Sequence, residues 1–211
     1  MKLQLALDTL SFKESIDLLD LVHQYIDIIE VGTPFLIEEG LKPIREFKKR
    51  YPNNLILADA KIMDAGEYES NLCFQAGADL VTVLGATNDI TIIEAVKAAK
   101  TYNGAIMIDM IAIQDLNKRC QEIDQFGVDY ICVHTAFDVQ KSGENPLAEL
   151  AVVNSLIKNS KSAVAGGLKY ETVKEVLKEG CEIIVVGGGI INERDQVEAC
   201  KKIRRLIDYE K

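Results

Sequence analysis

The chain has 211 residues, a formal net charge of −9 at pH 7, 48% hydrophobic residues and 27% charged residues. This composition is typical of a globular domain. The negative charge disfavours nucleic acid and anionic membranes as partners, because both require a basic surface. It does not disfavour a small anionic ligand, since backbone N–H groups at helix starts can bind phosphate without basic side chains.

The cysteines and the hydropathy of the chain indicate the cellular compartment in which the protein is expected. The five cysteines are scattered, odd in number and without CxxC pairing, which favours reduced thiols. No run approaches the roughly 18 uncharged apolar residues of a membrane span. The start, MKLQLALD, lacks the long apolar core of a signal peptide. We therefore expect a cytoplasmic protein with no membrane partner.

Short apolar runs rich in β-branched residues predict eight strands. In chain order they cover residues 3–8, 27–33, 54–61, 80–86, 105–111, 130–136, 162–168 and 182–190. The runs are mostly continuous rather than alternating, which is typical of parallel strands buried on both faces.

Segments with apolar residues at helical spacing separate these runs. They predict helices over residues 11–26, 38–51, 67–78, 89–102, 113–127, 145–160, 170–180 and 193–207. Ser11 is a candidate N-cap of the first helix. Gly77, Gly127 and Gly180 each close a helix before the next strand, a position that favours positive φ.

Eight successive strand–helix units predict the fold. With no linker or composition break, they indicate an α/β protein, a single (β/α)8 TIM barrel over residues 1–211. An open flavodoxin-like sheet would leave three units unused.

Charged residues gather at the ends of the predicted strands, where barrel enzymes have their active sites. They are Asp8, Glu30, Asp59, Lys61, Asp109 and His134. A buried carboxylate without a partner costs several kcal/mol. Four carboxylates at one barrel mouth therefore require a cation, a lysine or bound protons.

Glu30 and Asp59 end adjacent predicted strands and suit a hard octahedral cation such as Mg²⁺, with Mn²⁺ as a substitute. The alternative is that one of them caps the following helix. Lys61 should face the same way as Asp59, because strand side chains alternate. There it would offset the carboxylates and stabilise an oxyanion.

His134 is a candidate acid or base near neutral pH, and the alternative is a buried histidine bonded to a backbone carbonyl. Asp8 and Asp109 could position Lys61 or His134, or could contact substrate directly. Asp64 lies beyond the third strand and could equally be a helix cap.

Glycine pairs follow the last two predicted strands. Loops in these places often bind phosphate through backbone N–H groups in such barrels. Gly166, Gly167, Gly187 and Gly188 are therefore candidate phosphate-binding residues. The alternative is that they only permit tight turns.

Several motifs together resemble the 3-hexulose-6-phosphate synthase family, within the orotidine 5′-monophosphate decarboxylase suprafamily of barrels. They are LALDT, IIEVGTPFL, DAKIMDAG, ADLVTVLG, VHTAFDVQ, VAGG and VVGGGI, distributed along essentially the whole chain. The DxKxxD element at residues 59–64 is the mark of the suprafamily.

The resemblance implies a reversible Mg²⁺-dependent aldol reaction. D-ribulose 5-phosphate would lose a C1 proton, and the resulting enediolate would attack formaldehyde to give D-arabino-hex-3-ulose 6-phosphate. Glu30 and Asp59 match the metal-site carboxylates, and Lys61 matches the lysine beside the enediolate. His134 is assigned as proton shuttle, although the group that takes the C1 proton stays open. The resemblance also implies a homodimer in which Asp64 reaches the partner subunit's site.

The nearest alternative is 3-keto-L-gulonate 6-phosphate decarboxylase, which forms a similar enediolate by losing CO2. That family has arginine, threonine and arginine where this chain has Phe137, Ala165 and Gly188. These differences favour the synthase. Ala136, where the synthase family often has glycine, is less typical of it.

Two further hypotheses are an inactive sugar-phosphate-binding barrel and a ribulose-phosphate 3-epimerase. The epimerase is disfavoured because its metal site needs several histidines. The sequence does not distinguish formaldehyde detoxification, formaldehyde assimilation through the ribulose monophosphate pathway, and the reverse reaction. It also leaves open the physiological metal and the extent of decarboxylase side activity.

Overall fold

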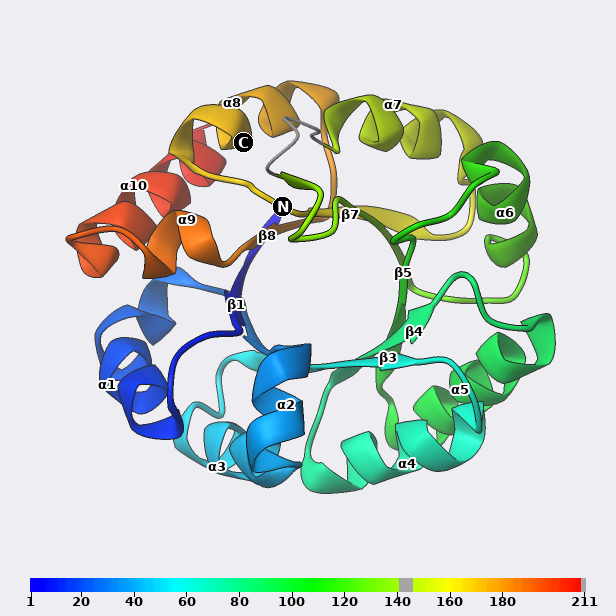
Figure 1. Ribbon diagram of the computed structural model, residues 1–211, viewed down its shortest axis with the longest axis horizontal. Helices are drawn as coiled ribbons and strands as arrows, with labels where there is room; N and C mark the ends of the chain where they lie inside the picture. The colour runs from blue at the N-terminus through cyan, green and yellow to red at the C-terminus, as the bar shows by residue number, and fades with distance from the viewer. Residues whose placement is uncertain (141–145, 210–211) are drawn as a thin grey trace.

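A computed structural model describes residues 1–140 and 146–209 and contains a closed parallel barrel. Its strands are β1 (Lys2–Leu7), β2 (Ile28–Val31), β3 (Leu55–Ile62), β4 (Leu80–Leu84), β5 (Ala105–Asp109), β6 (Tyr130–His134), β7 (Lys161–Ala165) and β8 (Ile183–Val186). Each strand pairs in parallel with its neighbours in sequence, and β8 pairs with β1. The predicted (β/α)8 barrel is confirmed (Figure 1).

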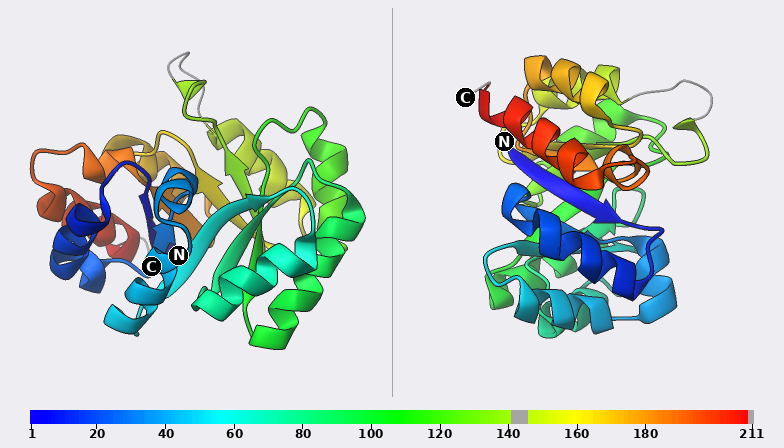
Figure 2. Two further views of the ribbon diagram at one scale, coloured as in Figure 1. Left: turned by 60° about the horizontal axis from the view of Figure 1, so that its bottom comes forward. Right: turned by 90° about the vertical axis from the view of Figure 1, so that its left-hand side faces the viewer.

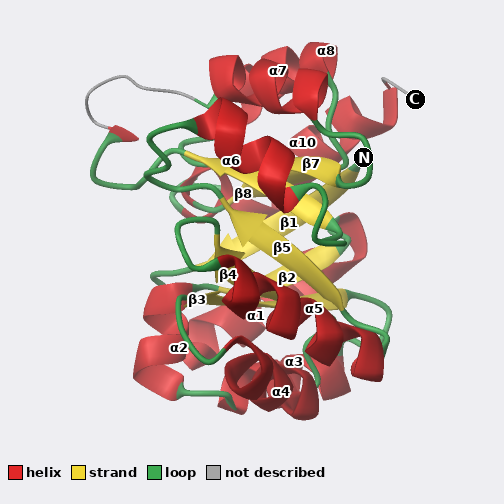
Figure 3. Ribbon diagram, turned by 90° about the vertical axis from the view of Figure 1, so that its right-hand side faces the viewer, coloured by secondary structure: helices red, strands yellow, loops and turns green. Residues whose placement is uncertain are grey.

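The helices form a ring outside the strands (Figures 1 and 3). They are α1 (Phe12–Val22), the short 3-10 helix η1 (His23–Tyr25), α2 (Thr33–Glu39), α3 (Lys42–Arg50), α4 (Gly66–Ala76), α5 (Asp89–Tyr102), α6 (Leu116–Ile123), α7 (Leu147–Leu156), α8 (Tyr170–Glu179), α9 (Gly188–Ile191) and α10 (Gln196–Tyr209). The last helix, α10, lies beside β1 and α1, so the two ends of the chain close the ring together (Figure 2). Among the described residues, no helix has the length and apolar character needed to cross a bilayer.

The barrel has two apolar cores. The larger one lies between the strands and the surrounding helices. The smaller one fills the barrel interior with Ala6, Ile28, Leu57, Leu80, Met107, Cys132, Ala163, Ala165, Ile183 and Val185. Because both faces of each strand are covered, the strands are nearly continuous apolar runs.

Local sequence signals set several element ends as predicted. Ser11 caps α1 and forms a capping box with Glu14. Gly77 and Gly180 directly follow α4 and α8 with φ values of 107° and 76°, which confirms these two glycine stops. Gly127 also has a positive φ, 80°, but α6 already ends at Ile123 with Asp124 as its C-cap, so the prediction that Gly127 closes this helix is wrong.

The prediction of one helix over residues 38–51 is wrong. The structure has α2 before Gly40 and α3 after Leu41, because Gly40 adopts φ 62° and ψ −146° and breaks the hydrogen-bonded run. Each helix has a proline in its first turn, which suits a helix start. The short helix α9 was also not predicted, and residue 145 of the predicted 145–160 helix lies outside the described residues.

Candidate active site

Polar side chains form the layer directly above the apolar barrel interior. Glu30, Asp59, Thr82, Asp109 and His134 each lie two residues after an interior apolar residue of the same strand. Since strand side chains alternate, these five share the inward face. The strand register therefore brings the predicted carboxylates and the histidine to one mouth of the barrel.

Lys61 reaches this cluster by a different route from the one expected. It has φ 46°, and the pairing of β3 with β4 shifts register between Ala58 and Ile62. Simple alternation therefore does not orient Lys61; a bulge in β3 does. Its Nζ lies 2.5 Å from Oδ2 of Asp59 and 3.4 Å from Oδ2 of Asp109.

Lys61 and Asp109 each stabilise the charged form of the other. Burial alone would lower the pKa of Lys61, but Asp59 and Asp109 outweigh it and raise the pKa above its ordinary value. For Asp109 the directions are reversed. Burial alone would raise its pKa, but the hydrogen bond and charge of His134 and the charge of Lys61 lower the pKa below its ordinary value. The site thus holds an ammonium and an ionised carboxylate out of bulk water.

Asp109 also fixes the histidine. Its Oδ2 lies 2.9 Å from Nδ1 of His134, and its Oδ1 accepts the backbone N–H of Ile111 at 2.9 Å. With an ionised Asp109, Nδ1 of His134 carries the proton and donates it. This leaves Nε2 as the nitrogen that can accept a proton from a substrate.

Asp59 is held by hydroxyl groups as well as by Lys61. Thr82 Oγ1 donates to Asp59 Oδ1 at 2.8 Å. Thr33 Oγ1 lies 2.9 Å from Oδ2 and 2.7 Å from the backbone oxygen of Asp59. The carboxylate therefore has a fixed orientation toward the barrel axis.

Glu30 is a buried carboxyl group that forms no ion pair with any described residue. It is 7% exposed and accepts one hydrogen bond, from Nε2 of Gln4 at 2.6 Å. Burial and the charges of Asp59 and Asp8 raise its pKa well above the usual range. Gln4 Oε1, on the same side chain that binds Glu30, has no hydrogen-bond partner among residues 1–140 and 146–209.

These observations fit a hard divalent cation. Within the described residues, no group of three or more His, Cys, Asp or Glu side chains is arranged to hold a metal. Mg²⁺, however, is commonly bound through one or two carboxylates, with water and substrate oxygens completing the shell. Glu30 and Asp59 supply such a pair, and an ion there would relieve the buried charge.

Asp8 lies between two glycine loops rather than against the predicted partners. A Cβ atom added to Gly32 would collide with Asp8 Oδ1, and one added to Gly187 would lie 3.5 Å from Asp8 Oδ2. No hydrogen bond joins Asp8 to Lys61 or His134 in the described part of the chain. Burial and Asp59 raise the pKa of Asp8, while Lys61 and His134 oppose that shift.

Asp64 is separate from the cluster. It lies in the exposed loop between β3 and α4, where its Oδ1 accepts the N–H of Ala65 at 2.7 Å. The N-cap of α4 is Ala65, which makes no side-chain capping bond, so Asp64 is not the cap of that helix.

The two predicted phosphate loops meet. Gly166 and Gly167 adopt φ values of 101° and 68° in the loop after β7. Gly187 and Gly188 begin the turn into α9 after β8. A Cβ atom added to Gly189 would collide with the backbone oxygen of Leu168, so the loops touch and their backbones form one surface.

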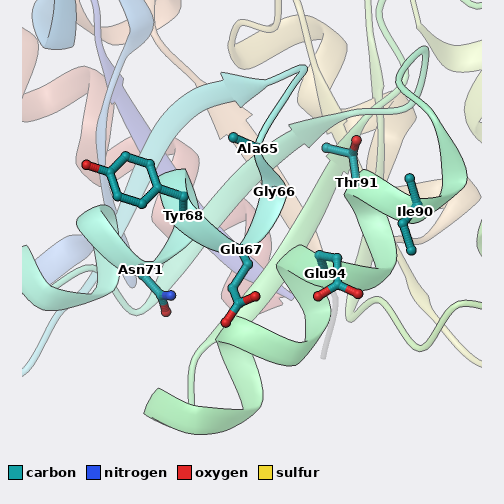
Figure 4. A pocket seen from close by; sticks show the side chains of 8 residues that line it. All are labelled: Ala65, Gly66, Glu67, Tyr68, Asn71, Ile90, Thr91 and Glu94. Carbon is teal, nitrogen blue, oxygen red and sulfur yellow. The ribbon is translucent and has the colours of Figure 1, made fainter.

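A hollow lies outside the barrel mouth, beside the Asp64 loop. Figure 4 shows its lining side chains, which come from the start of α4 and from α5. Tyr68 and Ile90 in this lining are 68% and 60% exposed, and Met63 in the adjacent loop is 52% exposed. These exposed apolar residues border the hollow and its adjacent loop, which makes this face a candidate protein contact surface.

Comparison with known proteins identifies the family. The model of the orotidine 5′-phosphate decarboxylase / HUMPS family matches residues 1–203. The chain belongs to this family. Within it, the chain is 48% identical to 3-hexulose-6-phosphate synthase of Bacillus subtilis (strain 168), over 98% of this chain and 99% of that protein.

Solved structures of the family agree. The crystal structure of 3-hexulose-6-phosphate synthase from Salmonella typhimurium superposes with a TM-score of 0.98 at 42% identity, covering 100% of both chains. The 3-keto-L-gulonate-6-phosphate decarboxylase from Vibrio cholerae has a TM-score of 0.86 at 24% identity, covering 100% of this chain and 98% of that one. The latter likeness is one of fold alone.

Sequence reasoning gave no role to Gln4, Thr33 and Thr82, all of which contact the cluster. Two of them carried a signal, because Gln4 and Thr82 are isolated polar residues inside otherwise apolar strands. Such residues need a hydrogen-bond partner when they are buried.

Proposed function

We propose that this chain is a Mg²⁺-dependent 3-hexulose-6-phosphate synthase that joins formaldehyde to D-ribulose 5-phosphate, giving D-arabino-hex-3-ulose 6-phosphate. Full-length relatives with this name support the proposal. The observation that carries it is the Lys61 ammonium, held between Asp59 and Asp109 beside the Asp109–His134 pair. Such a site can take a proton and stabilise an enediolate in one place.

The first step is loss of a proton from C1 of ribulose 5-phosphate. We assign its acceptance to Nε2 of His134, because Asp109 engages Nδ1 and stabilises the imidazolium that forms. C1 of the enediolate then attacks formaldehyde, a carbon–carbon bond forms, and the carbonyl oxygen of formaldehyde takes up a proton. The product contains all the atoms of both substrates and is a hex-3-ulose phosphate.

Lys61 serves the charged intermediate. A fixed ammonium in a site of low polarity stabilises developing negative charge more than a solvated one would. Its two carboxylate partners keep it protonated, so it acts as a charge rather than as a base.

We propose that Glu30 and Asp59 hold Mg²⁺, or Mn²⁺ in its place. The ion would polarise the substrate oxygens and share their negative charge. Thr33, Thr82 and Gln4 orient the two carboxylates for this role. We also assign the substrate phosphate to the joined glycine loops at Gly166–Gly167 and Gly187–Gly188, where backbone N–H groups could bind it without basic residues.

We propose a homodimer in which Asp64 acts at the partner subunit's site. The exposed position of Asp64 and the apolar residues Met63, Tyr68 and Ile90 near it support this arrangement. We place the enzyme in the cytoplasm, where its five free cysteines would stay reduced.

One assay series tests the function. The purified protein is given ribulose 5-phosphate or 3-keto-L-gulonate 6-phosphate, each with and without formaldehyde and with Mg²⁺ or EDTA. We expect consumption of ribulose 5-phosphate only with formaldehyde and Mg²⁺. Release of CO2 as the faster reaction would instead indicate the decarboxylase, and binding without turnover of either sugar would indicate an inactive barrel.

A further inference from the structure

The hydroxyl of Thr82 connects the two parts of β3 that carry the proposed chemistry. Its Oγ1 accepts the backbone N–H of Lys61 at 2.9 Å and donates to Oδ1 of Asp59 at 2.8 Å. Thr82 is 4% exposed, so water does not compete for these bonds.

The directions of both bonds are determined. The N–H of Lys61 can only donate, so the oxygen of Thr82 must accept there. The single hydroxyl proton of Thr82 is then available for Asp59. One hydroxyl thus fixes the backbone of the lysine and the side chain of the carboxylate that pairs with it.

Thr82 also occupies the gap in the strand pairing. Ala58 of β3 pairs with Val81 and Ile62 pairs with Val83, so three residues of β3 lie opposite Thr82 alone. The bulge removes regular ladder bonds at this point, and the hydroxyl replaces one of them.

The conformation held in this way is a costly one. Lys61 has φ 46°, in the left-handed region, which is unfavourable for a residue other than glycine. A residue keeps this conformation only where its surroundings impose it. The hydrogen bond from the Lys61 N–H to Thr82 Oγ1 is one such constraint.

We propose that Thr82 is a positioning residue for the aldol reaction: its hydroxyl holds the β3 bulge so that the Lys61 ammonium faces the reacting carbons. This inference rests on the proposed function. Thr82 touches neither substrate nor metal in this role, and it acts through the placement of Lys61. A misplacement of about 1 Å can cost roughly a hundredfold in rate.

The test compares Thr82→Val, which keeps the shape but removes the hydroxyl, with Thr82→Ser, which keeps the hydroxyl. At saturating Mg²⁺ we expect kcat of Thr82→Val to fall roughly a hundredfold, with KM for ribulose 5-phosphate within about twofold. Thr82→Ser should recover most of kcat. Thr101→Val, at an exposed hydroxyl of α5, is the matched control and should behave as wild type.

A second measurement does not depend on turnover. Lys61 should react slowly with an amine-acylating reagent, because its side chain is only 24% exposed and its Nζ lies against Asp59 and Asp109. In Thr82→Val the released amine should be acylated several times faster, as followed by mass spectrometry of the Lys61 peptide, while exposed lysines such as Lys13 should be unchanged.

The outcomes separate the two proposals. If the wild-type protein does not consume ribulose 5-phosphate with formaldehyde, the proposed function is wrong. The rate of Lys61 acylation in Thr82→Val still tests whether Thr82 positions Lys61. Wild-type kcat and acylation in Thr82→Val would overturn that role. It would also be overturned if Thr82→Val were slow at a limiting Mg²⁺ concentration but matched wild type at saturating Mg²⁺, because the substitution would then act through Asp59 and the metal. A Thr82→Ser protein as slow as Thr82→Val would show that the hydroxyl is not the group that matters.

Discussion

The Oδ2 atom of Asp109 lies 2.9 Å from Nδ1 of His134 and 3.4 Å from Nζ of Lys61. One carboxylate oxygen therefore serves both the proposed proton acceptor and the proposed charge stabiliser. His134 ends β6 and Lys61 lies near the end of β3, while Asp109 ends β5, which lies between these two strands in the barrel.

Removal of the ammonium should abolish most of the activity. We expect Lys61→Ala to lower kcat by roughly 10²–10³-fold, the usual effect of removing one group that stabilises developing negative charge. The measurement is formaldehyde-dependent consumption of ribulose 5-phosphate. Lys13→Ala, whose side chain is 86% exposed, is the control. Full activity in Lys61→Ala would eliminate the proposed mechanism.

The stability contributed by Asp109 should depend on pH. Its folded-state pKa lies below its unfolded-state value of about 3.9, so its contribution is present above that pH and is lost as pH falls through the lowered folded-state pKa. We expect Asp109→Asn to be less stable than wild type by about 1–3 kcal/mol at pH 7. The difference should shrink below about pH 4.

Urea denaturation at a series of pH values measures this difference. Asp17→Asn, at an exposed carboxylate of α1, is the control and should differ little from wild type at any pH. A destabilisation by Asp109→Asn that stays constant down to pH 3 would show that the charge of Asp109 is not its source. The variant should also lose activity, because an amide can bind either tautomer of His134.

Metal binding should depend on Glu30. Titration calorimetry of the wild-type protein with Mg²⁺ is expected to show one site per chain, and Glu30→Gln should weaken it by at least roughly tenfold, because a neutral amide attracts a cation less than a carboxylate does. Glu38→Gln, at an exposed position of α2, should leave the affinity unchanged. Equal Mg²⁺ affinity in Glu30→Gln and wild type would remove Glu30 from the proposed site.

A mixture of two inactive proteins tests the dimer. If Asp64 acts at the partner's site, a heterodimer of Lys61→Ala and Asp64→Ala chains has one site with both residues intact. Random exchange of equal amounts should then restore about a quarter of wild-type activity. If Asp64 acts within its own chain, every mixed site lacks one of the two residues, and no activity should return. Each protein alone is the control.

Much of this site followed from the sequence alone. Runs such as LILADAK and AIMID end in charged residues, and the C-terminal ends of parallel barrel strands meet at one mouth. The alternation of side chains along a strand is a property of a short segment, and barrel closure follows from the order of these segments in the chain. They are therefore sufficient to predict that Glu30, Asp59, Asp109 and His134 lie together at the barrel mouth.

Other features depended on contacts between distant segments. The orientation of Lys61 follows from a bulge in β3, and that bulge is held by the hydroxyl of Thr82 on another strand. The place of Asp8, between Gly32 and Gly187, likewise depends on two loops that are far apart in the chain.

The physical reason for this division is the range of the interactions. Side-chain alternation, capping and glycine stops act within a few residues, so the sequence determines which residues face the barrel mouth. Hydrogen bonds across strands decide how those residues are aimed, and they exist only once the barrel has closed.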